Sequence, residues 1–463
     1  MSISSFLTKK FLKSLFFPAH NRGVALPKKL VKLLKNPPGY WDLPELPEIG
    51  SPLSQKGLIA KSQRGFSERF KAKGCFFGVN GASGLIQSGI IAIAKPGENI
   101  LMPRNVHISV IKICAMQNIH PIFFDLDVSS ETGHYKPLTK KWLGDVFKKI
   151  NFDEKKIVGV ILVSPSYHGY AEDLEPLIDL CHQKKLPVLV DEAHGSYLLF
   201  CENLNLPKSA LLSKADLVVH SLHKSLNGLT QTAALWYRGN LVNEQNLINS
   251  INLLQTTSPS SLLLSSCEES IKDWLNKKSL SKYQTRILEA KSIYKKLIQK
   301  KVPLIETQDP LKIVLNTSKA GIDGFTADKF FYKNGLIAEL PEMMTLTFCL
   351  GFANQKDFLN IFEKVWNKLL LNSKKSKSLE LLQSPFKLVQ TPEVEIGIAW
   401  RSDTRIIPFS QSLNKISGDI ICPYPPGIPL LVPGEKIDID RFNWINNQSL
   451  WNKDLVNFNI RVI

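Results

Sequence analysis

The chain has 463 residues, of which 44% are hydrophobic, so it is long enough for two or three domains with their own cores, and a disordered or fibrous protein is excluded. Its 58 Lys and Arg residues exceed its 41 Asp and Glu residues, which gives a formal net charge of +17. No apolar run reaches the roughly 18 residues that a membrane helix requires, so a protein that spans a membrane is not expected.

The first 55 residues form a basic N-terminal segment. Residues 1–40 contain lysines and an arginine but no Asp or Glu. Phenylalanines and leucines between the lysines of residues 6–16 predict an amphipathic helix that packs on the rest of the protein. The same lysines interrupt the apolar stretch that a secretory signal peptide needs, so we expect no such signal.

Residues 56–300 are predicted to form a large domain in which strands and helices alternate. Helical spacing of apolar residues occurs in segments such as 83–94, 107–117 and 174–183. This alternation predicts an α/β fold with a largely parallel sheet that is covered on both faces. The apolar runs with the length of buried strands are 75–79, 99–102, 121–124, 157–163, 187–190, 217–219 and 233–237.

The rest of the chain is expected to add two smaller parts. One long helix is predicted over residues 268–301, because this stretch is rich in Lys, Leu, Ile and Glu and contains no Pro or Gly. A small α+β domain is expected at 301–371, and residues 380–463 are assigned to a C-terminal domain. The polar, basic stretch 372–378 predicts a linker between them. The strands of the small domain are expected at 312–315 and 344–350.

Seven cysteines are scattered along the chain without a C-x-x-C pair. An odd number at wide spacing predicts reduced thiols of a cytoplasmic protein, and neither a disulfide framework nor a zinc site. We therefore expect no metal site. The cysteines are Cys75, Cys114, Cys181, Cys201, Cys267, Cys349 and Cys422.

A lysine that directly follows a buried strand is the first candidate catalytic residue. Lys224 ends the run VVHSLHK at 218–224, and a parallel sheet binds ligands at the carboxyl ends of its strands. A lysine that reacts as an amine must be partly desolvated, because burial lowers its pKa toward neutrality. Most lysines beside strands are simply solvated, so the case for Lys224 depends on its neighbours in chain order.

An acid and a glycine-rich turn precede Lys224 in the order that a pyridoxal phosphate site needs. Asp191 ends a buried strand, where a carboxylate can keep the ring nitrogen of the cofactor protonated. The turn at 77–84 (FGVNGASG) joins a strand to a helix, so its backbone amides and the helix dipole can hold a phosphate. The alternatives are a magnesium-binding role for Asp191, although the chain has no G-x-x-x-x-G-K-[ST] motif, and a turn that serves only tight packing.

These segments resemble the ornithine, lysine and arginine decarboxylases that have the aspartate aminotransferase fold. The motif SLHK (221–224), followed by TQT (230–232), is similar to the family's cofactor-attachment signature. Further segments are similar to family motifs in the same chain order and extend the resemblance over nearly the whole chain. They are PAHNRG (18–23), DLPE (42–45), PRNVHIS (103–109), QTTSPS (255–260) and YPPGIP (424–429).

The resemblance implies a pyridoxal-phosphate-dependent transferase fold of type I, with a large domain, a smaller α+β domain and a C-terminal segment. It implies that Lys224 binds pyridoxal 5'-phosphate covalently, that Asp191 pairs with the pyridine nitrogen, and that His107 stacks on the ring. Either His223 or Lys224 would return a proton to the α-carbon of the substrate. The phosphate would be held by Ala82, Ser83, Gly84, Ser221 and His223, and Ala193 would pack on the other ring face.

The resemblance also implies a substrate and an assembly. The substrate is a basic amino acid, arginine or lysine and less favourably ornithine, which decarboxylation converts to agmatine, cadaverine or putrescine of polyamine metabolism. Glu339 is the predicted partner of the substrate's distal cation, since a carboxylate pairs with a guanidinium or ammonium group; the alternative is an ordinary edge charge. Ser258 is expected to reach an active site shared across a homodimer or higher homo-oligomer.

Two other interpretations stay open at the level of sequence. An aminotransferase or an α-oxoamine synthase would keep the fold and cofactor, because DEAHG (191–195) also resembles the latter. The net charge leaves a nucleic-acid-binding protein on an enzyme scaffold as the alternative of another class. The chain has no RNA-binding signature, so a nucleic acid partner is not expected. A membrane partner is not expected either, because no apolar run is long enough for a membrane helix. His194 and His220 are expected to be oriented by backbone carbonyls.

Overall fold

The computed structural model describes the chain except residues 1, 4, 6–12, 355–356, 373–380 and 450–457. Its centre is an eight-stranded sheet with the strand order β14-β4-β3-β5-β6-β7-β8-β2. Five adjacent strands are parallel: β4 (His120–Phe124), β3 (Asn99–Pro103), β5 (Ile157–Val163), β6 (Val188–Asp191) and β7 (Leu217–Ser221). Antiparallel pairing adds β14 (Val389–Gln390) at one edge, and β8 (Ala233–Tyr237) and β2 (Gly74–Gly78) at the other.

Each face of the main sheet packs against its own helices. Side chains alternate along a strand, so Leu189 of β6 belongs to one apolar cluster while Val188 and Val190 belong to another. The Leu189 cluster includes residues of α4 (Gly81–Ile93), α5 (Ile108–Gln117) and α9 (Glu244–Leu254). The opposite cluster includes residues of α3 (Leu58–Arg69), α6 (Lys140–Lys148), α7 (Glu175–Gln183) and α10 (Ser261–Leu275). The α/β fold with a largely parallel, doubly covered sheet is therefore confirmed.

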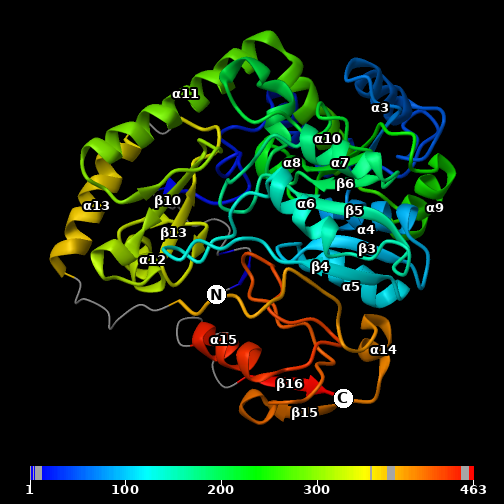
Figure 1. Cartoon of the computed structure of the whole chain (residues 1–463). Coiled ribbons are helices and arrows are strands. Elements are labelled where there is room, and N and C mark those ends of the chain that lie inside the picture. Colours follow the sequence, from blue (N-terminus) through cyan, green and yellow to red (C-terminus); the bar gives the residue numbers. More distant parts are fainter. Residues whose placement is uncertain (1, 4, 6–12, 355–356, 373–380, 450–457) are drawn as a thin grey trace.

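A second sheet lies beside the first and forms the small α+β part. Its strand order is β12-β13-β10-β9, all antiparallel. Figure 1 shows this sheet bordered by α11 (Lys277–Gln299), α12 (Gly324–Lys333) and α13 (Phe358–Asn372). Phe331, Phe348 and Phe362 pack in the same core cluster as the face of the large sheet that α3, α6, α7 and α10 cover, so the two parts share one continuous core. The strands are β9 (Leu304–Ile305), β10 (Lys312–Asn316), β12 (Leu340–Pro341) and β13 (Thr345–Cys349).

The C-terminal part, orange to red in Figure 1, packs beside α5 and the β4 edge of the large sheet. It contains α14 (Ile396–Arg401), α15 (Ile439–Ser449) and an antiparallel pair of strands, β15 (Arg405–Pro408) and β16 (Asn459–Val462). A buried ion pair ties it to the large sheet, since Arg104 Nη1 lies 2.8 Å from Glu435 Oε1. Its strand β14 hydrogen-bonds directly to β4.

The predicted single helix over residues 268–301 is wrong. The structure has two helices there, α10 and α11, separated at Asn276. Asn276 has an extended backbone (φ −75°, ψ 119°), and its Oδ1 accepts hydrogen bonds from the amides of Lys278 (3.1 Å) and Ser279 (3.2 Å). An asparagine that caps a helix N-terminus starts a new helix without Gly or Pro, which the composition of the stretch could not indicate.

The N-terminal segment forms a strand where a helix was expected to end. Most of the predicted helix over 6–16 lies outside the described residues, but β1 (Lys13–Ser14) pairs in parallel with β11 (Leu336–Ile337), and Leu15 is buried. A short helix, α2 (Lys28–Leu34), follows. Of the expected linker at 372–378, residues 373–378 also lie outside the described part, and the domain boundaries at 55, 300, 371 and 380 stay predictions.

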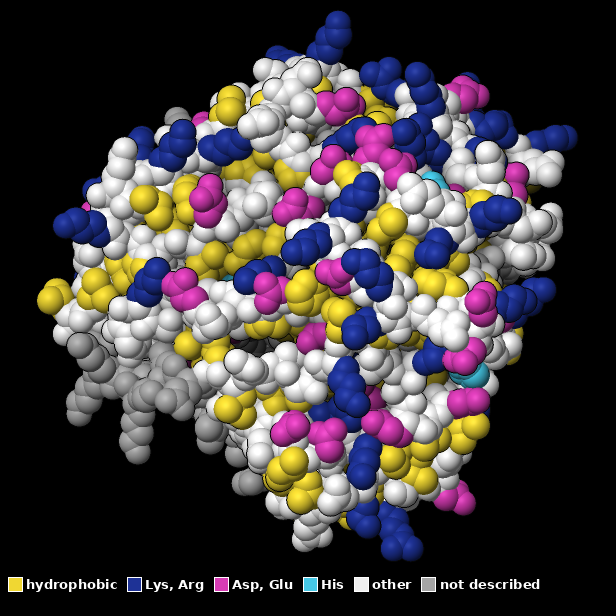
Figure 2. Space-filling model, in the orientation of Figure 1, with side chains coloured by type: hydrophobic (Ala, Val, Ile, Leu, Met, Phe, Trp, Pro, Cys, Tyr) yellow, Lys and Arg dark blue, Asp and Glu magenta, His cyan; other side chains and the backbone are white. Residues whose placement is uncertain are grey.

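The surface and the helices bear on possible partners. Among the described residues, no helix is both long and apolar enough to cross a membrane. On the face shown in Figure 2, Lys and Arg side chains are interspersed with Asp and Glu, so the net charge is not gathered there into one basic patch.

Candidate active site

A cavity of about 160 Å³ lies at the carboxyl ends of the parallel strands. Ligands bind at this edge of a parallel sheet, because the chain leaves each strand there in a loop whose side chains converge. The cavity brings together most of the residues singled out in the sequence. Those that line it are Ala82, Ser83, His107, Asp191, Ala193, Ser221, His223 and Lys224.

Lys224 enters the cavity from a single helical turn, α8 (Leu222–Ser225), that begins where β7 ends. Burial lowers the pKa of its ammonium group, and the positive charge of Lys312 lowers it further, while Asp191 opposes the shift. Its Nζ lies 3.0 Å from Nε2 of His194. A buried amine with a lowered pKa is a nucleophile that can react with a carbonyl group.

Asp191 is the last residue of β6 and is buried. Its Oδ1 accepts a hydrogen bond from the amide of Ala193 at 3.1 Å. Burial raises the pKa of its carboxyl group, and the charge of Lys224 and the Ala193 amide partly offset this. A carboxylate in this environment is strongly stabilised by a cationic partner, because burial makes an uncompensated charge costly.

The glycine-rich turn forms an uncapped helix N-terminus beside the cavity. No side chain caps α4, whose N-cap residue is Asn80. Gly81 has a φ of +70°, a conformation that favours glycine, and an added Cβ would meet nothing within 4 Å. Its amide donates to the carbonyl of Gln231 at 2.8 Å, so this turn is held to the segment after Lys224. The amides of the first turn of α4 suit an anion.

His107 caps α5 and lies under the C-terminal part. Its Nδ1 lies 2.9 Å from Ser109 Oγ and accepts from the Ser109 amide at 3.2 Å, which fixes the ring orientation. Gly427 packs so closely that an added Cβ would lie 3.1 Å from the imidazole. Burial, followed by the charges of Lys224 and Lys112, lowers the pKa of His107 to about 4, so the ring is neutral near pH 7.

His223 lies in α8 and is held by the last residue of β7. Its Nδ1 lies 3.1 Å from Ser221 Oγ. Burial, followed by the charge of Lys224, lowers the pKa of His223 to about 4, so it is neutral near pH 7. Ser221 and His223 together offer a hydroxyl and an imidazole nitrogen on one side of the cavity.

Three predicted site residues do not line the cavity. Gly84 is buried inside α4, where an added Cβ would lie 2.8 Å from Gln255 Nε2. Ser258 lies in an exposed turn, and its proposed role needs a second subunit. Glu339 lies behind Tyr167, accepting a hydrogen bond from the Tyr167 hydroxyl on Oε1 and one from the Phe17 amide on Oε2. The roles given to these residues stay predictions.

The expectation that His194 and His220 are oriented by backbone carbonyls is wrong. His194 lines the cavity and contacts Lys224, and its Nδ1 is buried without a hydrogen-bond partner among the described residues. His220 is held by side chains: its Nε2 lies 2.6 Å from Glu192 Oε2, and its Nδ1 accepts from Trp236 Nε1 at 2.9 Å.

Sequence reasoning also missed Lys312, a buried residue at the start of β10. Its Nζ lies 4.3 Å from the centre of the Phe17 ring and 3.1 Å from Cys349 Sγ. The sequence motifs do not indicate that Lys312 lies near Lys224. Lys312 belongs to the small sheet, and only the tertiary fold brings its charge close to Lys224.

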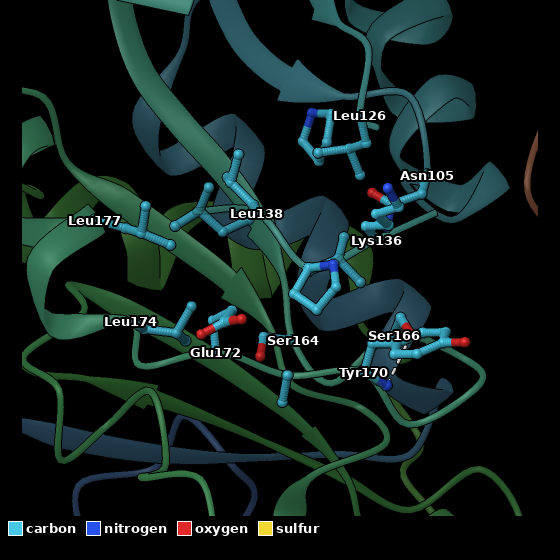
Figure 3. A pocket seen from close by; sticks show the side chains of 15 residues that line it. Asn105, Leu126, Lys136, Leu138, Ser164, Ser166, Tyr170, Glu172, Leu174 and Leu177 are labelled. Atoms are coloured by element: carbon cyan, nitrogen blue, oxygen red, sulfur yellow. Dashed lines mark hydrogen bonds between the residues drawn. The ribbon is translucent and has the colours of Figure 1, made fainter. Parts of the chain in front are cut away.

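A smaller cavity of about 30 Å³ adjoins the first (Figure 3). The residues Asn105, Val163 and Ser166 line both cavities, and Leu126, Leu138, Leu174 and Leu177 belong to the remaining wall. Ser166 Oγ accepts a hydrogen bond from the Tyr170 amide at 3.1 Å. This space is too small for more than a water-sized group and belongs to the packing beneath the site.

The donor set of the main cavity fits pyridoxal 5'-phosphate. The uncapped first turn of α4 with Ser83 and Ser221 suits a phosphate, and Asp191 is a buried carboxylate that needs a cationic partner such as a ring nitrogen. Lys224 supplies an amine of lowered pKa for an aldehyde. The flat imidazole of His107 offers a surface for an aromatic ring.

Two family models match the sequence. The first, described as "Orn/Lys/Arg decarboxylase, major domain", matches residues 13–308, and the second, the "C-terminal domain" of the same family, matches residues 376–454. Among curated proteins, an "Arginine decarboxylase" from Bacillus anthracis is 28% identical over 92% of this chain and 88% of its own length. An "Arginine decarboxylase" from Bacillus subtilis is 26% identical over 92% of this chain and 89% of its own length.

Solved structures are similar in fold. The constitutive lysine decarboxylase of E. coli has a TM-score of 0.74 and 16% identity, and the match covers 99% of this chain and 81% of that one. A structure of SPT with PLP has a TM-score of 0.52 and 14% identity over 68% of this chain and 77% of that one. The type I fold expected from the sequence is thereby confirmed.

Proposed function

The chain belongs to the Orn/Lys/Arg decarboxylase family and is therefore a carboxy-lyase of a basic amino acid, and from this premise we propose that its substrate is arginine and its cofactor pyridoxal 5'-phosphate. The observation that carries the proposal is the convergence of Lys224, Asp191, His107 and the uncapped start of α4 on one cavity. Because the chain belongs to the decarboxylase family, we no longer retain the aminotransferase and α-oxoamine synthase alternatives.

Each residue has a distinct task toward the cofactor. Lys224 would hold it covalently through its amine, and Asp191 would keep the ring nitrogen protonated, because a buried carboxylate is stabilised by a cationic partner. When bound, pyridoxal phosphate supplies a sink for the electron pair that remains on the α-carbon when CO2 leaves. The charge of Asp191 would stabilise that sink in the transition state. Preorganised electrostatic groups of this kind lower activation barriers by roughly 3 kcal/mol.

His107 and Ala193 would hold the cofactor ring between them, and neither side chain can move freely. His107 is held by Ser109 and by Gly427 of the C-terminal part, and Ala193 packs from the loop after β6. A fixed ring orientation matters because the bond to the carboxyl group must stand perpendicular to the ring for its electrons to enter the π system. The C-terminal part therefore contributes to catalysis by positioning His107.

Either Lys224 or His223 would return the proton to the α-carbon of the substrate, and the sequence does not distinguish between them. Lys224 is the nearer to a proton relay, because His194 Nε2 lies 3.0 Å from its Nζ. Burial, together with the neighbouring charge of Lys224, holds the pKa of His194 well below its usual range, so His194 accepts a hydrogen bond from an ammonium group rather than competing with it as a cation.

Arginine is supported by the curated arginine decarboxylases, and Glu339 offers a carboxylate for the distal cation of the substrate. Glu339 lies one side chain away from the cavity, behind Tyr167. A guanidinium group that takes over the Tyr167 hydrogen bond would form a charge-assisted pair with Glu339. We place the enzyme in the cytoplasm, in polyamine formation, and as a homodimer or larger, with the exposed turn at Ser258 directed to the partner subunit; light scattering would test the assembly.

The test is an assay of the purified enzyme with pyridoxal phosphate and, in turn, arginine, lysine and ornithine, in which CO2 and the amine are measured. We expect agmatine from arginine, and a visible absorption band from the bound cofactor. Lys224→Ala should lose the band and at least about 100-fold in rate, whereas the surface variant Lys208→Ala should retain both. No amine from any substrate, or a band that survives in Lys224→Ala, would contradict the proposal.

Substrate choice has its own variant in the same assay. Glu339→Gln should raise the KM for arginine by about 10- to 100-fold, the loss expected when a hydrogen bond to a charged group goes. Tyr167→Phe removes the hydroxyl and keeps the carboxylate, so its KM should change less. An unchanged KM in Glu339→Gln would remove Glu339 from the substrate site.

A further inference from the structure

Two histidines and a glutamate from three segments direct their side chains at one point. His134 precedes α6, His168 follows β5, and Glu342 lies between β12 and β13 of the small sheet. The Nε2 atoms of His134 and His168 lie 3.1 Å and 2.7 Å from the same atom, Oε2 of Glu342. One candidate ligand atom from each residue lies within 4.8 Å of the other two.

The two imidazole rings lie face to face and share one acceptor oxygen. The imidazole rings are stacked with their centres 3.6 Å apart and their planes 14° apart. The Thr345 hydroxyl lies 3.1 Å from Oε2 of Glu342 and 3.0 Å from Nε2 of His134, so three polar groups surround one carboxylate oxygen. A cation bound between the two imidazole nitrogens and the carboxylate uses the same convergence without requiring one oxygen to accept every bond.

The chemistry and the surroundings suit a transition-metal ion. Two imidazole nitrogens and one carboxylate oxygen form a known zinc ligand set, completed by water at a fourth position. Glu342 is 28% exposed at its side chain and lines a cavity of about 160 Å³, which provides room for that water, whereas His134 and His168 are buried. The Thr345 hydroxyl on Glu342 and the Tyr170 hydroxyl, 3.4 Å from His134 Nδ1, are partners that orient ligands.

We propose that His134, His168 and Glu342 form a binding site for a divalent transition-metal ion of the zinc class. The ion links two loops of the large sheet to the turn between β12 and β13 of the small sheet. It fixes His168, which lines both this cavity and the one that holds Lys224. The proposed metal site does not depend on the decarboxylase activity.

The test titrates the purified holoenzyme, stripped by a chelator and desalted, with Zn²⁺ alone. We expect about one tightly bound zinc ion per chain, as a site with three protein ligands predicts, measured by elemental analysis and by competition with a chromogenic chelator. His134→Gln and Glu342→Gln should bind zinc at least about 10-fold more weakly. His120→Gln, which removes a different histidine 3.1 Å from Glu395, should bind as the wild type does.

Two further readouts keep the proposal testable if a variant fails to fold. Co²⁺ bound to the wild-type enzyme should give visible bands of a tetrahedral nitrogen and oxygen site, without a thiolate charge-transfer band. Cofactor absorption and amine formation, measured separately, report on the proposed function and not on the metal. A wild-type enzyme that retains no zinc, or zinc bound equally by His134→Gln and Glu342→Gln, would overturn the proposal.

Discussion

At the scale of single residues, the site depends on cations and acids that are buried close together. Lys312 is buried and Lys224 is half-buried with a desolvated amine, so each places a charge where solvent screens it poorly. Asp191 is a buried acid, and its negative charge opposes the lowering of the Lys224 pKa. Burial and Lys312 both favour the neutral amine of Lys224, which is the form that captures an aldehyde.

The lowered pKa of Lys224 predicts how cofactor capture depends on pH. The capture rate of the cofactor-free protein should rise with pH as the amine loses its proton, with a midpoint below the ordinary lysine value of 10.5. Lys312→Met removes a positive neighbour, so the pKa of Lys224 and the midpoint should move up. Stopped-flow absorbance after mixing with pyridoxal phosphate measures both midpoints; a midpoint at or above 10.5 in the wild type would be inconsistent with a desolvated Lys224.

At the scale of elements, one residue decides whether a stretch is one helix or two. The stretch from α10 to α11 has helical composition throughout, and its break depends on Asn276. The cap is supported by Asp273, whose Oδ1 accepts from the Ser279 hydroxyl at 2.7 Å. The direction of α11, and with it the approach to the small sheet, therefore follows from a short polar contact.

The cap predicts a measurable loss of stability. Asn276→Ala removes the acceptor for the amides of Lys278 and Ser279 and should lower the free energy of unfolding by about 1 kcal/mol. Asn276→Asp keeps an acceptor oxygen and should stay close to the wild type. Urea denaturation of the three proteins provides the comparison, and equal midpoints for Asn276→Ala and the wild type would exclude a capping role.

At the scale of the whole molecule, the C-terminal part is joined to the large sheet by strand pairing and by a buried charge pair. Arg104 is 2% and Glu435 1% exposed at their side chains. The guanidinium also lies 3.7 Å from the ring centre of Phe386 and 4.7 Å from that of Phe123. Because Gly427 of the same part packs on His107, this junction positions a residue of the active site.

Removing one partner of that pair should be costly. Glu435→Gln leaves the Arg104 charge buried and unpaired, which destabilises by roughly 3–5 kcal/mol, whereas the double variant Arg104→Met/Glu435→Leu should recover most of the loss. The exposed pair Lys148–Asp145 is the control, and Lys148→Ala should unfold close to the wild-type midpoint. Urea unfolding and limited proteolysis of the C-terminal part measure the effects; a Glu435→Gln protein as stable as the wild type would show that the charge is compensated elsewhere.

The sequence by itself determined the alternating strands and helices and the convergence of Asp191 with Lys224. Both residues stand at the ends of apolar runs, and the ends of neighbouring parallel strands must meet at one edge. The uncapped turn before α4 was likewise readable, because its glycines and its place between strand and helix are local properties. The break at Asn276 was local too, but its cap gives a weaker signal than Gly or Pro.

Only the tertiary structure decided which distant side chains meet. His168 and Glu342 are 174 residues apart and belong to different sheets, so no spacing rule predicts their contact. The same holds for Lys312 beside Phe17, and for Glu339 behind Tyr167. Local patterns specify which face of an element is apolar, whereas the approach of two sheets depends on the packing of the whole core, and it is this packing that sets the partners of buried polar groups.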